Sequence, residues 1–132
     1  MNDAAIRRQI RILKDMGCNA IRTSHNMPAP ELIRACDEMG MMVMAESFDE
    51  WKAMKVKNGY RHVLTNGQLK DLTNLLRHYR NNPSVVMWCI GNEFPNNGME
   101  IKDLRCLIFY RNFVIVKIRH VLSHRGWMRR ML

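Results

Sequence analysis

The stretch PSVVMWCIGNEFPNN at positions 83–97 changes character in its middle. Its first half contains a continuous apolar run, Val85–Cys89, with the length and composition of a buried β-strand. The run leads into Gly91, Asn92 and Glu93, so an amide and a carboxylate stand at the end of a segment suited to a dry interior. In parallel α/β folds, functional side chains gather just after the carboxyl ends of strands. The stretch therefore predicts both a strand and a site.

The residues upstream of this strand alternate between two periodicities. Apolar residues at helical spacing predict helices at 2–16, 31–39 and 68–80, and short apolar runs predict strands at 18–21, 41–45 and 85–89. Asn2 or Asp3 can cap the first helix, Gly17 ends it, and the irregular segment 52–66 suggests a long loop. The run at 41–45 does not alternate, which favours a strand covered on both faces. The order helix, strand, helix, strand, helix, strand predicts parallel crossovers in an α/β protein.

Length and composition limit the class of protein. A chain of 132 residues, 47% of them apolar, is long enough for one domain with a real core, which excludes a disordered tail. It contains no run of eighteen apolar residues and no export leader at its start, so we expect a soluble, cytoplasmic protein. Four irregularly spaced cysteines without a C-x-x-C pair suggest core side chains in a reducing compartment rather than zinc ligands.

The net charge of +9 is unevenly distributed. Residues 1–100 hold 13 Lys and Arg against 11 Asp and Glu, whereas residues 101–132 hold 8 against one. We therefore expect a domain at 1–100 and a basic tail of separate character at 101–132. The tail interleaves cations with aromatic residues, so the alternative to an enzyme is a binding protein that uses it on nucleic acid or an anionic surface. Because no nucleic-acid motif accompanies the tail, we expect neither nucleic acid nor membrane as a partner.

Polar clusters follow all three predicted strands. They are Arg22–Asn26, Glu46–Trp51 and Asn92–Glu93, and parallel strands place all three on one rim of the sheet. A carboxylic acid among apolar neighbours can stay protonated near neutral pH, as a general acid requires. The rim therefore suits acid/base chemistry, and the amide beside the carboxyl suits a sugar hydroxyl.

Each of these groups also has a plain structural interpretation. Glu93 could cap a helix, His25 could close a turn, Glu46, Asp49 and Glu50 could form a solvated acidic rim, and Trp51 could fill a core. The combination favours the functional interpretation, because an aromatic ring beside carboxylates is a natural stacking platform for a sugar.

Two long motifs carry a family resemblance. NAIRTSHNMPAPELIRACDEMGMMVMAESFDEW at 19–51 and RNNPSVVMWCIGNE at 80–93 closely resemble the catalytic barrel of glycoside hydrolase family 2, the β-galactosidase and β-glucuronidase family. The resemblance covers about residues 2–100. It implies a partial (β/α)8 TIM barrel, from the first helix through the fourth strand, in an α/β fold.

The resemblance also implies roles for individual residues. It makes Glu93 the general acid/base, Asn92 the ligand of the substrate's 2-hydroxyl, and His25 a second contact to the sugar. The loop from Glu46 through Trp51 corresponds to a carboxylate-rich substrate loop, which follows the third strand of the family's barrel. This chain departs from the family's usual Asp-Glu pair at that strand end, because Ala45 precedes the glutamate.

The activity implied is hydrolysis of O-glycosidic bonds in β-galactosides or related β-glycosides by a retaining, two-carboxylate mechanism. The family's nucleophile lies on the seventh strand and is not among these residues, so we expect little activity from them alone. The open sheet would need the remainder of a barrel, or a second copy of the chain, as its partner. Some relatives bind magnesium near the position of Glu50, but no complete ligand set is present, so we predict no metal and no cofactor.

Overall fold

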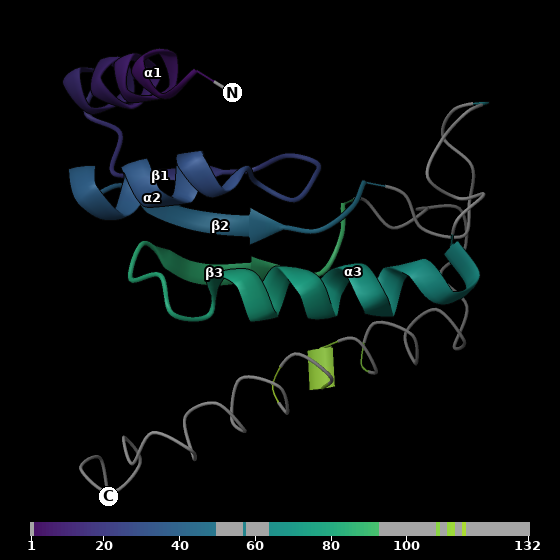
Figure 1. Ribbon diagram of the computed structural model, residues 1–132. Helices are drawn as coiled ribbons and strands as arrows, with labels where there is room; N and C mark the ends of the chain where they lie inside the picture. The colour runs from purple at the N-terminus through teal and green to yellow at the C-terminus, as the bar shows by residue number, and fades with distance from the viewer. Residues whose placement is uncertain are drawn as a thin grey trace, which may run out of the picture. The chain divides into compact units, whose positions relative to one another are not determined.

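The computed structural model describes residues 2–49, 57, 64–92, 108, 111, 112 and 115 (Figure 1). The chain divides into two compact units, Met1–Phe94 and Pro95–Leu132. Most of the predicted basic tail at 101–132 falls outside the described residues, and the proposed boundary at residue 100 stays a prediction. Within the described part, no helix is long and apolar enough to cross a membrane.

Helices and strands alternate through the first unit, as the sequence predicted. In chain order they are α1 (Asp3–Asp15), β1 (Ala20–Arg22), α2 (Pro30–Met39), β2 (Met42–Glu46), α3 (Leu64–Tyr79) and β3 (Val85–Cys89). The main difference is that α3 begins at Leu64 rather than at Gln68, within the segment expected to be a loop. A glycine inside a helix costs only about 1 kcal/mol relative to alanine, so Gly67 does not stop the helix.

The ends of α1 follow from the residues that cap it. The Asn2 side chain accepts hydrogen bonds from the backbone N–H groups of Ala4 (3.0 Å) and Ala5 (3.4 Å), which confirms the predicted cap. At the other end, Gly17 adopts φ +88°, a left-handed conformation that glycine tolerates best. The N–H of Cys18 then bonds to the carbonyl of Leu13 at 2.9 Å, which closes a Schellman motif and turns the chain toward β1.

The three strands form one parallel sheet in the order β1-β2-β3. Arg22 lies opposite Met44, and Glu46 lies opposite Cys89, so the carboxyl ends of the three strands reach the same edge. The register shifts once, between Val43 and Met44 on β2. The parallel order confirms the predicted crossovers and brings together the loops that follow each strand.

Alternate residues of β2 face different surroundings. Val43 and Ala45 are fully buried, and α2 packs against β2 (Figure 1). Met42, on the other face, is 40% exposed, and Met87 on β3 is 55% exposed. The prediction of a strand covered on both faces is therefore wrong for the start of β2. An apolar composition indicates that a face of a strand can be buried, but no described residues cover the face that carries Met42.

The core is built mainly from the helices and the helix-facing side of β2. Its fully or almost fully buried apolar side chains are Ile6, Ile10, Ile33, Ala35, Cys36, Met41, Val43, Ala45, Phe48, Leu72, Leu75, Leu76 and Tyr79. These side chains fix the helices against the sheet, and thus the positions at which the strands end.

Two polar contacts tie the helices to the loops around the sheet. The Tyr79 hydroxyl, at the end of α3, donates a 2.6 Å hydrogen bond to the Pro28 carbonyl in the loop after β1. The Asp37 carboxylate on α2 accepts hydrogen bonds from the Asn82 side chain (2.6 Å) and the Ser84 backbone (2.9 Å), just before β3. Desolvation acts against ionisation of Asp37, but hydrogen bonds from Ser84 and Asn82 outweigh it and lower the pKa of this carboxyl.

Candidate active site at the carboxyl edge of the sheet

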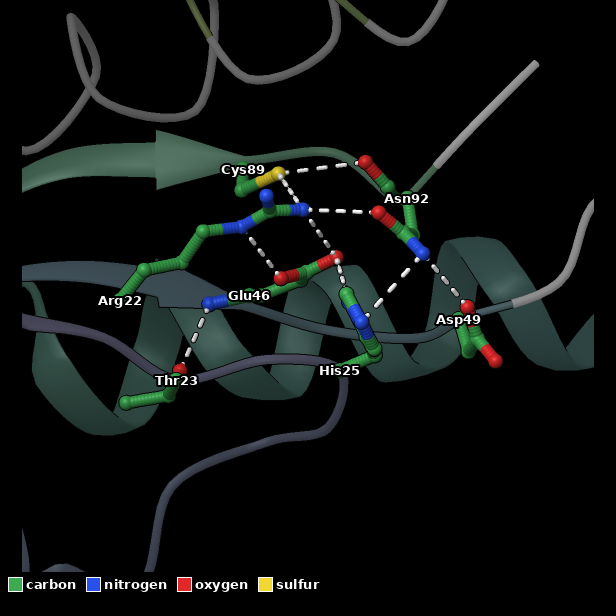
Figure 2. Close-up of polar contacts among 8 residues, drawn as sticks. Arg22, Thr23, His25, Glu46, Asp49, Cys89 and Asn92 are labelled. Carbon is green, nitrogen blue, oxygen red and sulfur yellow. Dashed lines mark hydrogen bonds and ion pairs between the residues drawn. The ribbon is translucent and has the colours of Figure 1, made fainter.

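The three predicted polar clusters meet at the carboxyl edge of the sheet. Arg22 is the last residue of β1, Glu46 is the last residue of β2, and Asn92 follows β3 by three residues. His25 and Asp49 come from the loops after β1 and β2, and Figure 2 shows these side chains converging on one another. The structure thus brings together His25, Glu46 and Asn92 of the predicted site residues.

An ion pair between a buried carboxylate and a partly exposed arginine anchors the site. The Glu46 side chain has no exposed surface, and its two oxygens accept hydrogen bonds from Arg22, at 2.9 Å from Nε and 3.1 Å from Nη2. The Thr23 hydroxyl accepts a hydrogen bond from the Glu46 backbone N–H at 3.0 Å. A buried carboxylate is stable only with such a partner, and the hydrogen bonds to Glu46 in turn raise the pKa of Arg22.

Asn92 is held at both ends of its amide. Its oxygen accepts a hydrogen bond from Arg22 Nη2 at 3.0 Å, and its nitrogen donates to Asp49 Oδ1 at 2.8 Å. The same nitrogen lies 3.5 Å from Nε2 of His25 (Figure 2). One side chain therefore connects groups from the ends of all three strands.

The His25 ring lies between Asn92 and Glu46. Its Nδ1 is 3.4 Å from Glu46 Oε1, and its side chain is 39% exposed. Since an amide nitrogen can only donate, Nε2 of a neutral ring acts as the acceptor and the ring proton sits on Nδ1, facing the carboxylate. His25 thus keeps an exposed edge available to a ligand while both nitrogens are oriented by the protein.

Cys89 belongs to this edge rather than to the interior. Its sulfur donates to the Gly91 carbonyl at 3.1 Å and lies 4.0 Å from Arg22 Nη2, and the residue is half-buried. Cys36 is the fully buried thiol that the sequence predicted, and its burial, with Asp37 nearby, raises its pKa to about 11. Cys18 is half-buried, so the expectation of core cysteines holds fully for only one of the three described.

Two predicted site residues, Glu93 and Trp51, lie outside the described residues, as does Glu50 near the possible magnesium position. The described residues contain no group of three or more His, Cys, Asp or Glu side chains that could hold a metal ion.

The sequence did not assign Arg22 a function. A signal for it was available, because Arg22 and Glu46 each come at the end of a predicted strand, and the ends of neighbouring parallel strands lie close together.

Comparison with known proteins places these strands in a family. The family model for the TIM barrel domain of glycosyl hydrolases family 2 matches residues 1–111. A β-galactosidase of Bacteroides ovatus, BoGH2A, is 50% identical over 102 residues, which make up 77% of this chain and 12% of that protein. A putative β-glucuronidase of Formosa agariphila is 38% identical over 88 residues, 67% of this chain and 8% of the relative.

Solved structures agree with this assignment. A glycosyl hydrolase family 2 member from Bacteroides cellulosilyticus superimposes with a TM-score of 0.81 at 36% identity, covering 88% of this chain and 15% of that one. A β-glycosidase from Bacteroides vulgatus gives a TM-score of 0.72 at 39% identity, over 84% of this chain and 14% of that one. The chain spans about an eighth of the length of the Bacteroides ovatus relative. It belongs to glycoside hydrolase family 2, and its parallel strands and helices form part of that family's TIM barrel.

Proposed function

We propose that this chain supplies the acid/base side of a retaining β-glycosidase site, with Glu93 as the general acid/base. The observation that carries the proposal is the position of Asn92, the residue before Glu93, at the carboxyl edge of the sheet and within reach of His25 and Asp49. The carboxyl ends of strands are where barrel enzymes place their catalytic groups. Glu93 would protonate the leaving oxygen and then activate water in the second step.

The substrate contacts follow from chemistry and exposure. Asn92 and His25 are the side chains that would hydrogen-bond the sugar hydroxyls, and His25 is partly exposed. Glu46 is fully buried with both oxygens bonded to Arg22, which favours a role in holding Arg22 over direct contact with a sugar. Trp51 remains the proposed stacking surface for the sugar ring.

The proposed substrates are β-galactosides or related β-glycosides. The names of the relatives, a β-galactosidase and a putative β-glucuronidase, support this class of bond. A retaining mechanism needs a second carboxylate about 5 to 5.5 Å from the first as nucleophile. We place that group on a later barrel strand, so the partner that completes the site is the remainder of such a barrel. A second copy of the chain could cover the open sheet edge.

A chimera tests the role of Glu93. Residues 2–100 would replace the matching segment of the Bacteroides ovatus β-galactosidase, and hydrolysis of 4-nitrophenyl β-galactoside and β-glucuronide would be measured. We expect turnover that falls by about 100-fold to 10,000-fold in Glu93→Gln, the usual contribution of a general acid. Glu38→Gln is the matched control, because Glu38 is an exposed carboxylate on α2 that pairs with Arg7. Equal activity of the two variants would exclude Glu93 as the acid/base.

The same substrates should also be tested with the 132-residue chain by itself. We expect no turnover, because the resemblance places the nucleophile elsewhere. Turnover that disappears in Glu93→Gln would show that these residues already contain both carboxylates.

A further inference from the structure

We infer that Arg22, held by Glu46, is a positioning residue that fixes the orientation of the Asn92 amide. Asn92 then faces a bound ligand as a hydrogen-bond donor. The orientation follows from the contacts of the described residues, and its meaning for sugar binding rests on the proposed function. Arg22 ends the first strand of the described sheet and Asn92 follows the last, so β1 would control the residue that precedes the proposed acid/base.

The chemistry of the two neighbours sets the orientation of the amide. Arg22 carries only donors, and it meets the amide at 3.0 Å, while an ionised Asp49 carries only acceptors and meets it at 2.8 Å. Rotating the amide by half a turn would set N–H groups against the guanidinium and a carbonyl against the carboxylate. Two attractive contacts would become two repulsive ones, so one orientation is strongly favoured.

Arg22 is itself fixed before it meets Asn92. Glu46 binds it through two hydrogen bonds, and the backbone of Glu46 bonds in turn to the Thr23 hydroxyl, so the pair is tied to both strands. The Nη2 group donates to Glu46 Oε1 at 3.1 Å and to Asn92 Oδ1 at 3.0 Å, and Cys89 Sγ lies farther away at 4.0 Å. A lysine ammonium has no planar fork and cannot reproduce this geometry, although it keeps the charge.

The arrangement determines what Asn92 can offer to a ligand. Its oxygen is occupied by Arg22, and one N–H is directed to Asp49. The contact from its nitrogen to His25, at 3.5 Å, is longer than its contacts to Arg22 and Asp49 and is the one that a ligand oxygen would replace. Asn92 would thus donate to an oxygen acceptor and discriminate against a ligand group that carries only donors.

The orientation can be measured directly by NMR on the 132-residue chain. The side-chain amide resonances of Asn92 in a ¹⁵N spectrum would be assigned by their loss in Asn92→Asp. We expect Arg22→Lys to shift them, because the charged donor to Oδ1 is displaced. Arg7→Lys is the matched control, since Arg7 pairs with Asp3 and Glu38 on the helices, and it should leave them in place. Unmoved resonances in a folded Arg22→Lys variant would overturn the inference.

An exchange of partners tests the same orientation without altering Arg22. Asn92→Asp places a second carboxylate next to that of Asp49, and the repulsion between them should lower the urea midpoint of unfolding. Adding Asp49→Asn restores a donor and acceptor pair while the oxygen facing Arg22 is kept, so the double variant should recover most of the loss. A double variant that is no more stable than Asn92→Asp alone would contradict the proposed orientation.

A titration with methyl β-D-galactopyranoside separates this inference from the proposed function. We expect the sugar to shift the Asn92 side-chain resonances in the native chain and to shift them less in Arg22→Lys. Resonances that respond to Arg22→Lys but to no concentration of the sugar would support the positioning role and count against the galactoside site. An equal response to the sugar in both chains would overturn the link between Arg22 and ligand binding.

Discussion

Removing one oxygen atom from Tyr79 should weaken the fold and loosen the loop that carries His25. Tyr79 is only 4% exposed, and its hydroxyl donates a 2.6 Å hydrogen bond to the carbonyl of the buried Pro28. Burial, with the charge of Glu31 adding to it, raises the pKa of Tyr79, so the hydroxyl keeps its proton at any pH suitable for the measurement. Tyr79→Phe removes this donor and leaves the ring in place.

The size of the effect follows from the two groups involved. A typical internal hydrogen bond contributes about 1 kcal/mol net, and a buried acceptor left without a partner costs about 1 to 3 kcal/mol. We therefore expect Tyr79→Phe to lower the free energy of unfolding by about 2 kcal/mol. With a urea dependence of about 2 kcal/mol per molar, the unfolding midpoint should fall by roughly 1 M.

Urea unfolding followed by circular dichroism measures this loss. Tyr79→Leu serves as the comparison, because it removes the ring as well and should cost clearly more through lost packing. In the folded Tyr79→Phe variant the NMR signals of His25, three residues before Pro28, should broaden or move. A midpoint within about 0.2 M of the native value, with unchanged His25 signals, would refute the anchoring role of this hydroxyl.

Three other features give independent predictions. The lowered pKa of Asp37 means that its stabilising contribution is complete above the unfolded-state value of about 3.9 and is lost as the pH falls through the lower folded-state pKa. Asp37→Asn should remove that part of the acid dependence of the urea midpoint, and an unchanged pH profile would count against it. With a pKa of about 11, the Cys36 thiol is ionised in about one molecule in a thousand at pH 8. Iodoacetamide should therefore label Cys36 at least about 100-fold more slowly than half-buried Cys18, as measured by a mass-spectrometric time course. Equal labelling rates would contradict the burial of Cys36. Gly40 has φ +68°, and a Cβ added there would meet only Lys14 Nζ, at 3.9 Å. Thermal unfolding should therefore show a loss of about 1 to 2 kcal/mol of stability for Gly40→Ala and a smaller loss for Gly40→Asn, because asparagine tolerates the left-handed conformation better than alanine. Equal losses would argue against backbone conformation as the cause.

The local signals in the sequence predicted most of the framework. The strand Val85–Cys89, the cap at Asn2 and the turn at Gly17 all lie where residue type alone indicated, because each depends on neighbours along the chain. The start of α3 was not predicted, because Leu64 lies in the irregular segment 52–66 that suggested a loop. The exposure of Met42 could not be predicted, because burial depends on what covers a face and not on the strand itself.

The sequence predicted where the candidate site lies, but only part of how its side chains contact one another. Ordering the strands was enough to bring His25, Glu46 and Asn92 to one edge. The sequence could not show that Glu46 is fully buried against Arg22, because this depends on the register of two strands whose ends are 24 residues apart. The roles of Glu93 and Trp51 stay predictions.

The link between Arg22 and Asn92 has a consequence for how the domain folds. The two side chains are 70 positions apart, while the caps of α1 close over two to five residues. Helix ends can form early and locally, but this contact requires all three strands to be paired and the intervening chain to be closed into a loop. We therefore expect the polar network at the sheet edge to complete late in folding, so that its formation marks a chain in which every described strand has found its neighbour.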